Sequence, residues 1–139
     1  MEILLDTNIL IWALTDDPKL SYEAKKMITN DSNDVFYSTI SLFEIAIKHS
    51  KFPEIFPFTS REVFEYALDA NIDNIPLFNK HIFQLDTLRI KDKSKHKDPF
   101  DRILLAQAKR GNKIFLTHDR MLDDYDESFI KIVWQLIKR

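Results

Sequence analysis

Apolar runs and polar breaks alternate along this chain in a pattern that is typical of α/β proteins. Short runs rich in aliphatic, β-branched or aromatic residues at 3–5, 35–37 and 114–117 predict buried strands. The longer segments between them carry apolar residues at helical spacing or begin and end with capping residues. Because strands and helices alternate, we expect an open parallel sheet.

Capping residues set the ends of the predicted helices. The capping residues are Ser21, Thr59 with Glu62, Asp98 with Pro99, and Gly111. The predicted helices are 8–14, 22–29, a segment that opens at 38–41 and ends before Pro53, 63–70, 78–88 and 99–110. Each boundary is a local prediction, because it depends on residues within one helical turn.

The remaining segments complete the predicted order. Residues 72–77 predict an edge strand, because Pro76 cannot donate a hydrogen bond to a neighbouring strand. A last strand is predicted around Ile130 to Trp134, and the charged stretch 89–97 predicts an exposed loop. The aromatic residues expected in the core are Trp12, Phe36, Phe43 and Trp134.

Composition removes several classes of function. With 139 residues, the chain has the length of a single domain, and we expect one domain over 1–139. The absence of cysteine excludes disulfides and thiolate metal sites. The single glycine, Gly111, excludes a phosphate-binding Walker loop and a dinucleotide fingerprint. A net charge of −2 gives no overall attraction to nucleic acid, which would need local positive charge.

The pattern also argues against a membrane protein. No apolar run approaches the roughly 18–20 residues that a membrane-spanning helix needs. The chain starts with acidic Glu2 and an early Asp6 where a secretory signal would carry basic residues. We therefore expect a cytoplasmic protein with no membrane partner.

Four acidic residues lie where a parallel sheet would bring them together. Asp6 follows the first strand, Glu44 lies in the helix after the second, Asp101 is in the first turn of the 99–110 helix, and Asp119 follows the 114–117 strand. The carboxyl ends of parallel strands form one edge, where open sheets bind ligands. Each aspartate alone has a structural explanation as a turn or helix-start residue, but an unpaired carboxylate at Glu44 amid apolar residues would be costly.

Taken together, these acids predict a cation site. Several ionised carboxylates share a poorly solvated cleft only with raised pKa values or with a cation between them. An all-oxygen set without cysteine suits Mg²⁺ or Mn²⁺. Such ions lower the pKa of water and stabilise charge on a phosphoryl group, so the predicted chemistry is phosphodiester hydrolysis.

Several segments together resemble the PIN-domain ribonucleases. They are Leu5-Asp6-Thr7-Asn8, Ser41-Leu42-Phe43-Glu44, His96-Lys97-Asp98-Pro99-Phe100-Asp101-Arg102 with Leu105-Ala106-Gln107-Ala108, and Leu116-Thr117-His118-Asp119. The start of the 99–110 helix is most similar to VapC-type toxins of bacterial toxin–antitoxin modules. The resemblance covers nearly the whole chain, in the order and spacing of the family.

The resemblance implies an α/β/α sandwich around a parallel sheet of about five strands, and a divalent-metal-dependent endoribonuclease. It carries catalysis and the binding of Mg²⁺ or Mn²⁺ onto Asp6, Glu44, Asp101 and Asp119. It also implies that Asn8, Ser41 and Thr117 form hydrogen bonds with these metal ligands. Of the two aspartates before the Leu-Leu-Ala-Gln-Ala run, Asp101 matches the family's acid in its spacing to Ala106, and Asp98 is left as the helix cap.

The resemblance also implies partners: an RNA substrate, a cognate antitoxin that blocks the cleft, and a second copy in a homodimer. Lys97, Arg102 and Arg120 are candidates to contact RNA phosphates. The alternative for Lys97 is a solvated loop, and for the two arginines it is neutralisation of the acidic cluster. His96 and His118 fit structural or substrate contacts better than metal binding, since four carboxylates already suffice.

Two other functions compete with the nuclease. One is a non-catalytic module that keeps the fold and sequesters RNA or a protein partner, although such a module has little physical reason to keep four mutually repelling carboxylates. The other is a phosphatase with Asp6 as nucleophile. The common phosphatase pattern needs a second aspartate two positions later, and this chain has Asn8 there.

Overall fold

A parallel β-sheet forms the centre of the molecule. The computed structural model describes residues 1–92 and 98–133. The strands are β1 (Glu2–Leu5), β2 (Asp34–Ser38), β3 (Asp73–Ile75), β4 (Ile114–Thr117) and β5 (Ile130–Ile132). They lie in the order β3-β2-β1-β4-β5, and each neighbouring pair is parallel. The predicted edge strand at 72–77 is confirmed as β3.

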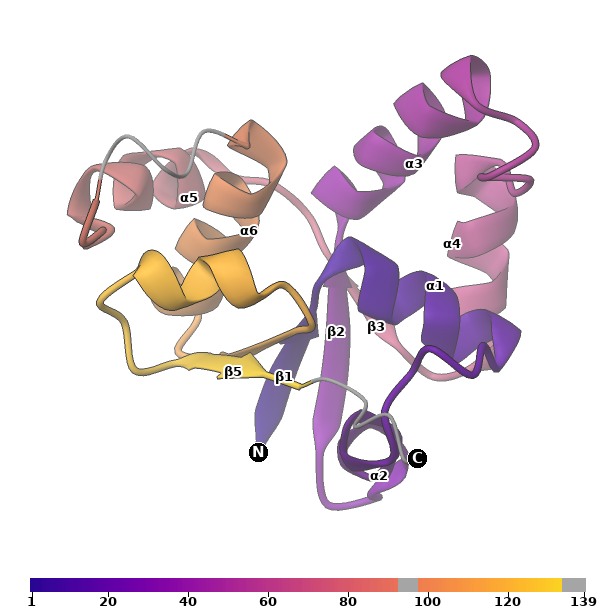
Figure 1. Ribbon diagram of the computed structural model, residues 1–139, viewed down its shortest axis with the longest axis horizontal. Helices are drawn as coiled ribbons and strands as arrows, with labels where there is room; N and C mark the ends of the chain where they lie inside the picture. The colour runs from indigo at the N-terminus through magenta and orange to yellow at the C-terminus, as the bar shows by residue number, and fades with distance from the viewer. Residues whose placement is uncertain (93–97, 134–139) are drawn as a thin grey trace.

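Helices cover both faces of this sheet (Figure 1). The α-helices are α1 (Thr7–Thr15), α2 (Tyr22–Thr29), α3 (Thr39–Lys51), α4 (Ser60–Asp69), α5 (Asn79–Gln84) and α6 (Pro99–Arg110). Two short 3₁₀ helices are η1 (Leu85–Thr87) and η2 (Arg120–Asp124). Figure 1 shows α1, α2 and α4 on one side of β1 and β2, with α5 and α6 on the other. The predicted α/β/α sandwich around five parallel strands is confirmed.

The central strand explains the two layers. Along β1, Ile3 and Leu5 pack into the core on the side of α1, α2 and α4, whereas Leu4 packs against α6. All three side chains are fully buried. A strand buried on both faces loses the polar alternation of a surface strand, which is why its sequence is continuously apolar. Asp6 directly follows the carboxyl end of this strand and caps α1.

Local capping signals identified the capping residues correctly, although α4 begins at Ser60, three residues before the predicted start at 63. The Ser21 side chain accepts a hydrogen bond from the Ala24 amide at 3.1 Å, and Thr59 with Glu62 forms the complete capping box. At α6, the Asp98 carboxylate accepts from the Phe100 amide at 2.9 Å. These contacts satisfy amides that the first helical turn leaves without partners, and so they fix where each helix begins.

Several predictions differ from the structure. The 78–88 segment is not one helix: α5 ends at Gln84, where the Thr87 hydroxyl donates to the Gln84 carbonyl at 2.8 Å and a 3₁₀ turn follows. The expected core residue Phe43 is 56% exposed, because it lies on the outer face of α3 with its ring edge against Phe100. Trp12 and Phe36 are half-buried against the core, and Trp134 lies outside the described residues.

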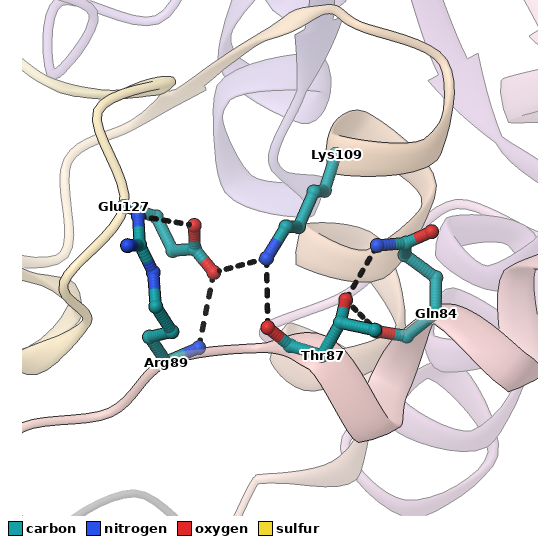
Figure 2. Close-up of polar contacts among 5 residues, drawn as sticks. All are labelled: Gln84, Thr87, Arg89, Lys109 and Glu127. Atoms are coloured by element: carbon teal, nitrogen blue, oxygen red, sulfur yellow. Dashed lines mark hydrogen bonds and ion pairs between the residues drawn. The ribbon is translucent and has the colours of Figure 1, made fainter.

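A network centred on Glu127 ties three segments together on the α6 side (Figure 2). The buried Glu127 carboxylate accepts from the Lys109 ammonium at 2.8 Å and from the Arg89 amide at 3.0 Å. Lys109 also donates to the Thr87 carbonyl at 2.7 Å. The network therefore fixes α6 to the end of η1 and to the segment that leads into β5.

Candidate active site

Asp6 is held by both of the strands that end beside it. The Asp6 amide donates to the Leu116 carbonyl at 2.9 Å, which continues the β1–β4 pairing by one residue. Its carboxylate accepts from the Thr7 amide at 2.7 Å and from the Thr117 hydroxyl at 2.6 Å. Asp6 is only 7% exposed. These bonds fix the direction of the carboxylate at the start of α1.

Glu44 reaches the same region from α3. Its carboxylate accepts from the Thr7 hydroxyl at 2.8 Å and from the Lys48 ammonium at 2.5 Å. The Thr7 hydroxyl also lies 2.8 Å from the Ser41 hydroxyl. Since Thr7 gives its one proton to the carboxylate, Ser41 must donate to Thr7. Ser41 therefore orients Glu44 through Thr7.

Two further acids come from α6 and from the end of β4. Asp101 lies in the first turn of α6, directly after the Asp98–Pro99 start. Asp119 caps η2 by accepting from the Met121 amide at 2.9 Å, and its own amide donates to the Thr117 hydroxyl at 3.1 Å. Thr117 thus contacts both Asp6 and Asp119.

These side chains line one cavity at the carboxyl end of the sheet. Its volume is about 220 Å³. The lining residues are Asp6, Thr7, Asn8, Glu44, Lys48, Asp98, Asp101, His118 and Asp119. A larger hollow of about 800 Å³ lies at the opposite end, where β2 and β3 begin. Ligands of open parallel sheets bind at the carboxyl end, so the smaller cavity is the candidate site.

The shared cavity changes the proton affinity of its carboxylates. Burial, and after it the charges of Asp6, Asp98, Asp119 and Glu44, raises the pKa of Asp101 to about 8. Burial also raises the pKa of Asp6 to about 6, although the hydrogen bonds from Thr117 and Thr7 oppose this. At neutral pH the cavity therefore favours a bound proton or a cation over full ionisation.

The donor chemistry of the cavity fits a hard divalent cation. Carboxylate oxygens are the ligands that Mg²⁺ and Mn²⁺ prefer, and four predicted ligands line the same small space. Within residues 1–92 and 98–133, no group of three His, Asp or Glu side chains is already gathered for ligation. Hydrogen bonds hold Asp6 and Glu44 to neighbouring hydroxyls, and like charges oppose closer approach.

The other predicted site residues divide into two groups. Asn8 lines the cavity, and Thr117 forms a hydrogen bond with Asp6. Ser41 reaches Glu44 only through the hydroxyl of Thr7. Arg102 and Arg120 are exposed, and Arg120 borders a different hollow with residues of η2 and β5. Lys97 lies outside the described residues. The structure therefore gathers the acids and their hydrogen-bonding neighbours more closely than the predicted phosphate-binding arginines.

Sequence reasoning missed Thr7 and Lys48 of the cavity, and it expected a structural or substrate contact for His118. Thr7 bonds Glu44, Lys48 forms an ion pair with it, and the His118 ring lies 4.5 Å from the Trp12 ring. The position of Lys48 was detectable, because it follows Glu44 by four residues, the spacing of a helical ion pair. The Thr7–Glu44 contact spans 37 residues and had no local signal.

Solved structures share this fold at low sequence identity. One similar chain comes from the crystal structure of VapBC2 from Rickettsia felis bound to a fragment of promoter DNA. It is 20% identical to this protein in sequence, with a TM-score of 0.72. The match covers 96% of this chain and 99% of that one. A chain of a toxin–antitoxin complex from Klebsiella pneumoniae is 17% identical with a TM-score of 0.61, covering 96% and 99%. A domain of a functionally unknown protein from Methanocaldococcus jannaschii is 15% identical with a TM-score of 0.57, covering 99% and 94%.

Comparison at the sequence level locates the family. A search of curated proteins gave no match. None of the helices in the described part of the chain has the length and apolar character needed to cross a membrane. A family model for the PIN domain matches residues 3–128, which include all five acids of the cavity. The chain therefore belongs to the PIN domain family.

Proposed function

We propose that this protein is a divalent-metal-dependent endoribonuclease that serves as the toxin of a toxin–antitoxin pair. The observation that carries the proposal is the gathering of Asp6, Glu44, Asp101 and Asp119 around one cavity of about 220 Å³. These acids come from four separate segments of the fold. Membership of the PIN domain family supports a nuclease in general.

The four carboxylates would hold Mg²⁺ or Mn²⁺ in this cavity. Such an ion would lower the pKa of water and stabilise the negative charge that builds on a phosphoryl group. Thr117 and Thr7 hold the Asp6 and Glu44 carboxylates in fixed directions through hydrogen bonds of 2.6 Å and 2.8 Å. Fixed directions matter because ligands that need no reorganisation at the moment of reaction lower its barrier.

The reaction proposed is hydrolysis of an RNA backbone linkage. A water oxygen forms a bond to phosphorus and gives up a proton, one P–O bond of the backbone breaks, and the departing oxygen takes up a proton, so that one water is consumed for each bond cleaved. Asn8 lines the cavity, and in this proposal its side-chain amide donates to a phosphate oxygen. Arg102 is exposed one residue after Asp101, where its guanidinium could contact a neighbouring phosphate. Arg120 is a further candidate for the same role, and Lys97 stays a candidate from the sequence alone.

This proposal includes two protein partners: a cognate antitoxin and a second copy of the chain. Support comes from two of the similar structures, a VapBC2 assembly on promoter DNA and a toxin–antitoxin complex. An antitoxin that covers the carboxyl end of the sheet would close the cavity to RNA. Binding would then silence the toxin without altering its fold.

The proposal is tested by growth of cells that express the chain without an antitoxin. Wild type should arrest growth, and Asp6→Asn should abolish the arrest, because one metal-binding carboxylate becomes a neutral amide. Asp34→Asn is the matched control, since Asp34 is exposed at the opposite end of the sheet. Circular dichroism of the purified variants checks that both are folded.

The same experiment separates the nuclease from its main alternative. A non-catalytic module that sequesters RNA or a partner should arrest growth equally well with Asp6→Asn. Equal arrest by wild type and this variant would therefore overturn the nuclease and favour sequestration.

A further inference from the structure

Lys48 is the lysine that lines the acidic cavity within the described part of the chain. It lies one helical turn after Glu44 on α3, and its ammonium is 2.5 Å from a Glu44 carboxylate oxygen. The Glu44 side chain is 9% exposed, whereas that of Lys48 is 36% exposed. The carboxylate is thus fixed inside the protein, and the cation reaches it from the cavity rim.

An aromatic ring holds the ammonium from a second direction. The Lys48 ammonium lies 5.2 Å from the centre of the Phe56 ring, within the range of a cation–π contact. Phe56 follows α3, and its carbonyl lies 2.6 Å from a ring nitrogen of His49. Phe56 also lines an apolar hollow of about 470 Å³ beside the acidic cavity. The lysine is therefore placed between the carboxylate and the wall of this hollow.

The charge balance of the cavity gives this placement a consequence. Its lining includes five acids but, among the described residues, a single lysine and no arginine. An ammonium beside Glu44 offsets part of the repulsion among these carboxylates. A divalent cation bound by Glu44 would approach the same carboxylate, so the two positive charges oppose each other's binding.

We propose that Lys48 is a tethered counter-ion that occupies Glu44 until a divalent cation displaces it, and that the displaced ammonium then contacts a phosphate of the substrate. The inference rests on the proposed metal-dependent cleavage of RNA. Lys48 has a flexible side chain that is partly exposed, so its ammonium can leave Glu44 without a backbone change. The metal-free protein thereby avoids full repulsion, and the loaded one gains a cation for the polyanionic substrate.

Binding of Mn²⁺ alone, measured by calorimetry without RNA, tests the first half. Neutral variants Lys48→Met and Lys48→Gln should bind Mn²⁺ roughly five- to tenfold more tightly than wild type, the lower end of typical coupling between two sites. Lys48→Arg keeps the charge and should resemble wild type. The matched control is Lys51→Met, which removes an exposed charge from the same helix away from the cavity. Phe56→Leu removes the cation–π contact but keeps the Lys48 charge, so it should show a smaller gain in Mn²⁺ affinity.

Kinetics of RNA cleavage test the second half. Lys48→Met should raise KM severalfold while Lys48→Arg restores it, because the displaced cation contributes to substrate binding. Lys48→Met and Lys48→Gln that bind Mn²⁺ no more tightly than Lys51→Met would overturn the counter-ion, and an unchanged KM would overturn the phosphate contact.

The two proposals fail in different ways. If the neutral variants bind Mn²⁺ more tightly and wild type cleaves no RNA, the result supports the counter-ion and excludes the nuclease. Metal-dependent cleavage by wild type with unchanged Mn²⁺ affinity in the neutral variants would support the nuclease and remove the counter-ion.

Discussion

Asp101 illustrates how a carboxylate proposed to bind metal can weaken the fold. Burial, followed by the charges of four neighbouring acids, raises its pKa to about 8, and the Asp6 carboxyl follows at about 6. An aspartate in an unfolded chain titrates near ~3.9. Between these values the folded protein binds protons that the unfolded chain releases, which links stability to pH.

The metal-free protein should become less stable as pH rises from about 4 to about 8. The stabilising protonation of Asp6 and Asp101 is complete below the unfolded pKa and is lost through pKa values of about 6 and about 8. Urea unfolding in EDTA at pH 5 and pH 8 measures the difference. Asp101→Asn should remove part of the slope, because an amide does not titrate. Burial lowers the pKa values of His81 and His118, which opposes this loss over part of the same range. A loss of stability from pH 5 to pH 8 that is no smaller in Asp101→Asn than in wild type would therefore contradict the electrostatic account.

Thr117 has a larger role than its small side chain suggests. Its buried hydroxyl donates to Asp6 and accepts from the Asp119 amide, so one residue connects two of the proposed ligands. Thr117→Val preserves shape but should weaken Mn²⁺ binding by roughly 10–100-fold, the usual effect of removing a residue that orients metal ligands. Thr117→Ser keeps the hydroxyl and should bind nearly as wild type. Equal Mn²⁺ affinity of the two variants in calorimetry would refute this role.

At the scale of elements, the site depends on how α3 and α6 are joined. Ser38, which caps α3, forms a buried side-chain hydrogen bond with Gln107 on α6. The Gln107 amide also donates to the Pro76 carbonyl at 3.3 Å. Glu44 on α3 and Asp101 on α6 are thereby related through a polar contact in the interior. Such contacts specify one arrangement of two helices where apolar packing alone tolerates several.

Glu127 anchors α6 from its other end (Figure 2). Burial opposes its ionisation, but the hydrogen bonds and charges of Lys109 and Arg89 hold the pKa of this carboxyl below its usual value. The Glu127 contribution to stability is therefore present above the unfolded pKa and lost as pH falls through the lower folded value. It acts at lower pH than the Asp6 and Asp101 contribution and with the opposite sign.

Glu127→Gln should destabilise the protein by about 1–2 kcal/mol at pH 7, because a charged hydrogen-bond acceptor is replaced by a neutral one. Urea unfolding measures this loss. Glu65→Gln is the control, since Glu65 forms an exposed pair with Arg61 at 3.8 Å and should change stability by less than about 0.5 kcal/mol. A loss in Glu127→Gln no greater than in the control would show that the network contributes little.

Across the whole molecule, features encoded within one turn of chain were predictable and long-range ones were not. The caps at Ser21, Thr59 and Asp98 matched because their partners lie two or three residues away. The ordered motifs led to the PIN domain family and to a sheet with the acids at one edge. The Ser38–Gln107 contact joins residues 69 positions apart, and no local pattern announces it.

The failed predictions have physical causes of the same kind. Phe43 was expected in the core because α3 is mostly apolar, but the helix presents only part of its surface to the sheet. The phosphate contacts predicted for Arg102 and Arg120 stay predictions: both residues are exposed and neither lines the acidic cavity, because adjacent residues on a helix point in different directions. Lys48 had the correct helical spacing to Glu44, and that spacing was the better guide to the cavity.

The measurement that tests the central claim most directly is cleavage of total cellular RNA by the purified chain in Mn²⁺, in Mg²⁺ and in EDTA. Asp6→Asn and Asp101→Asn are run beside wild type, with the exposed Asp34→Asn as control. We expect discrete fragments from wild type and Asp34→Asn with either ion, and intact RNA in EDTA and with both cavity variants. Cleavage that persists in EDTA or in the cavity variants, or intact RNA with folded wild type and both ions, would contradict a metal-dependent nuclease built on these four acids.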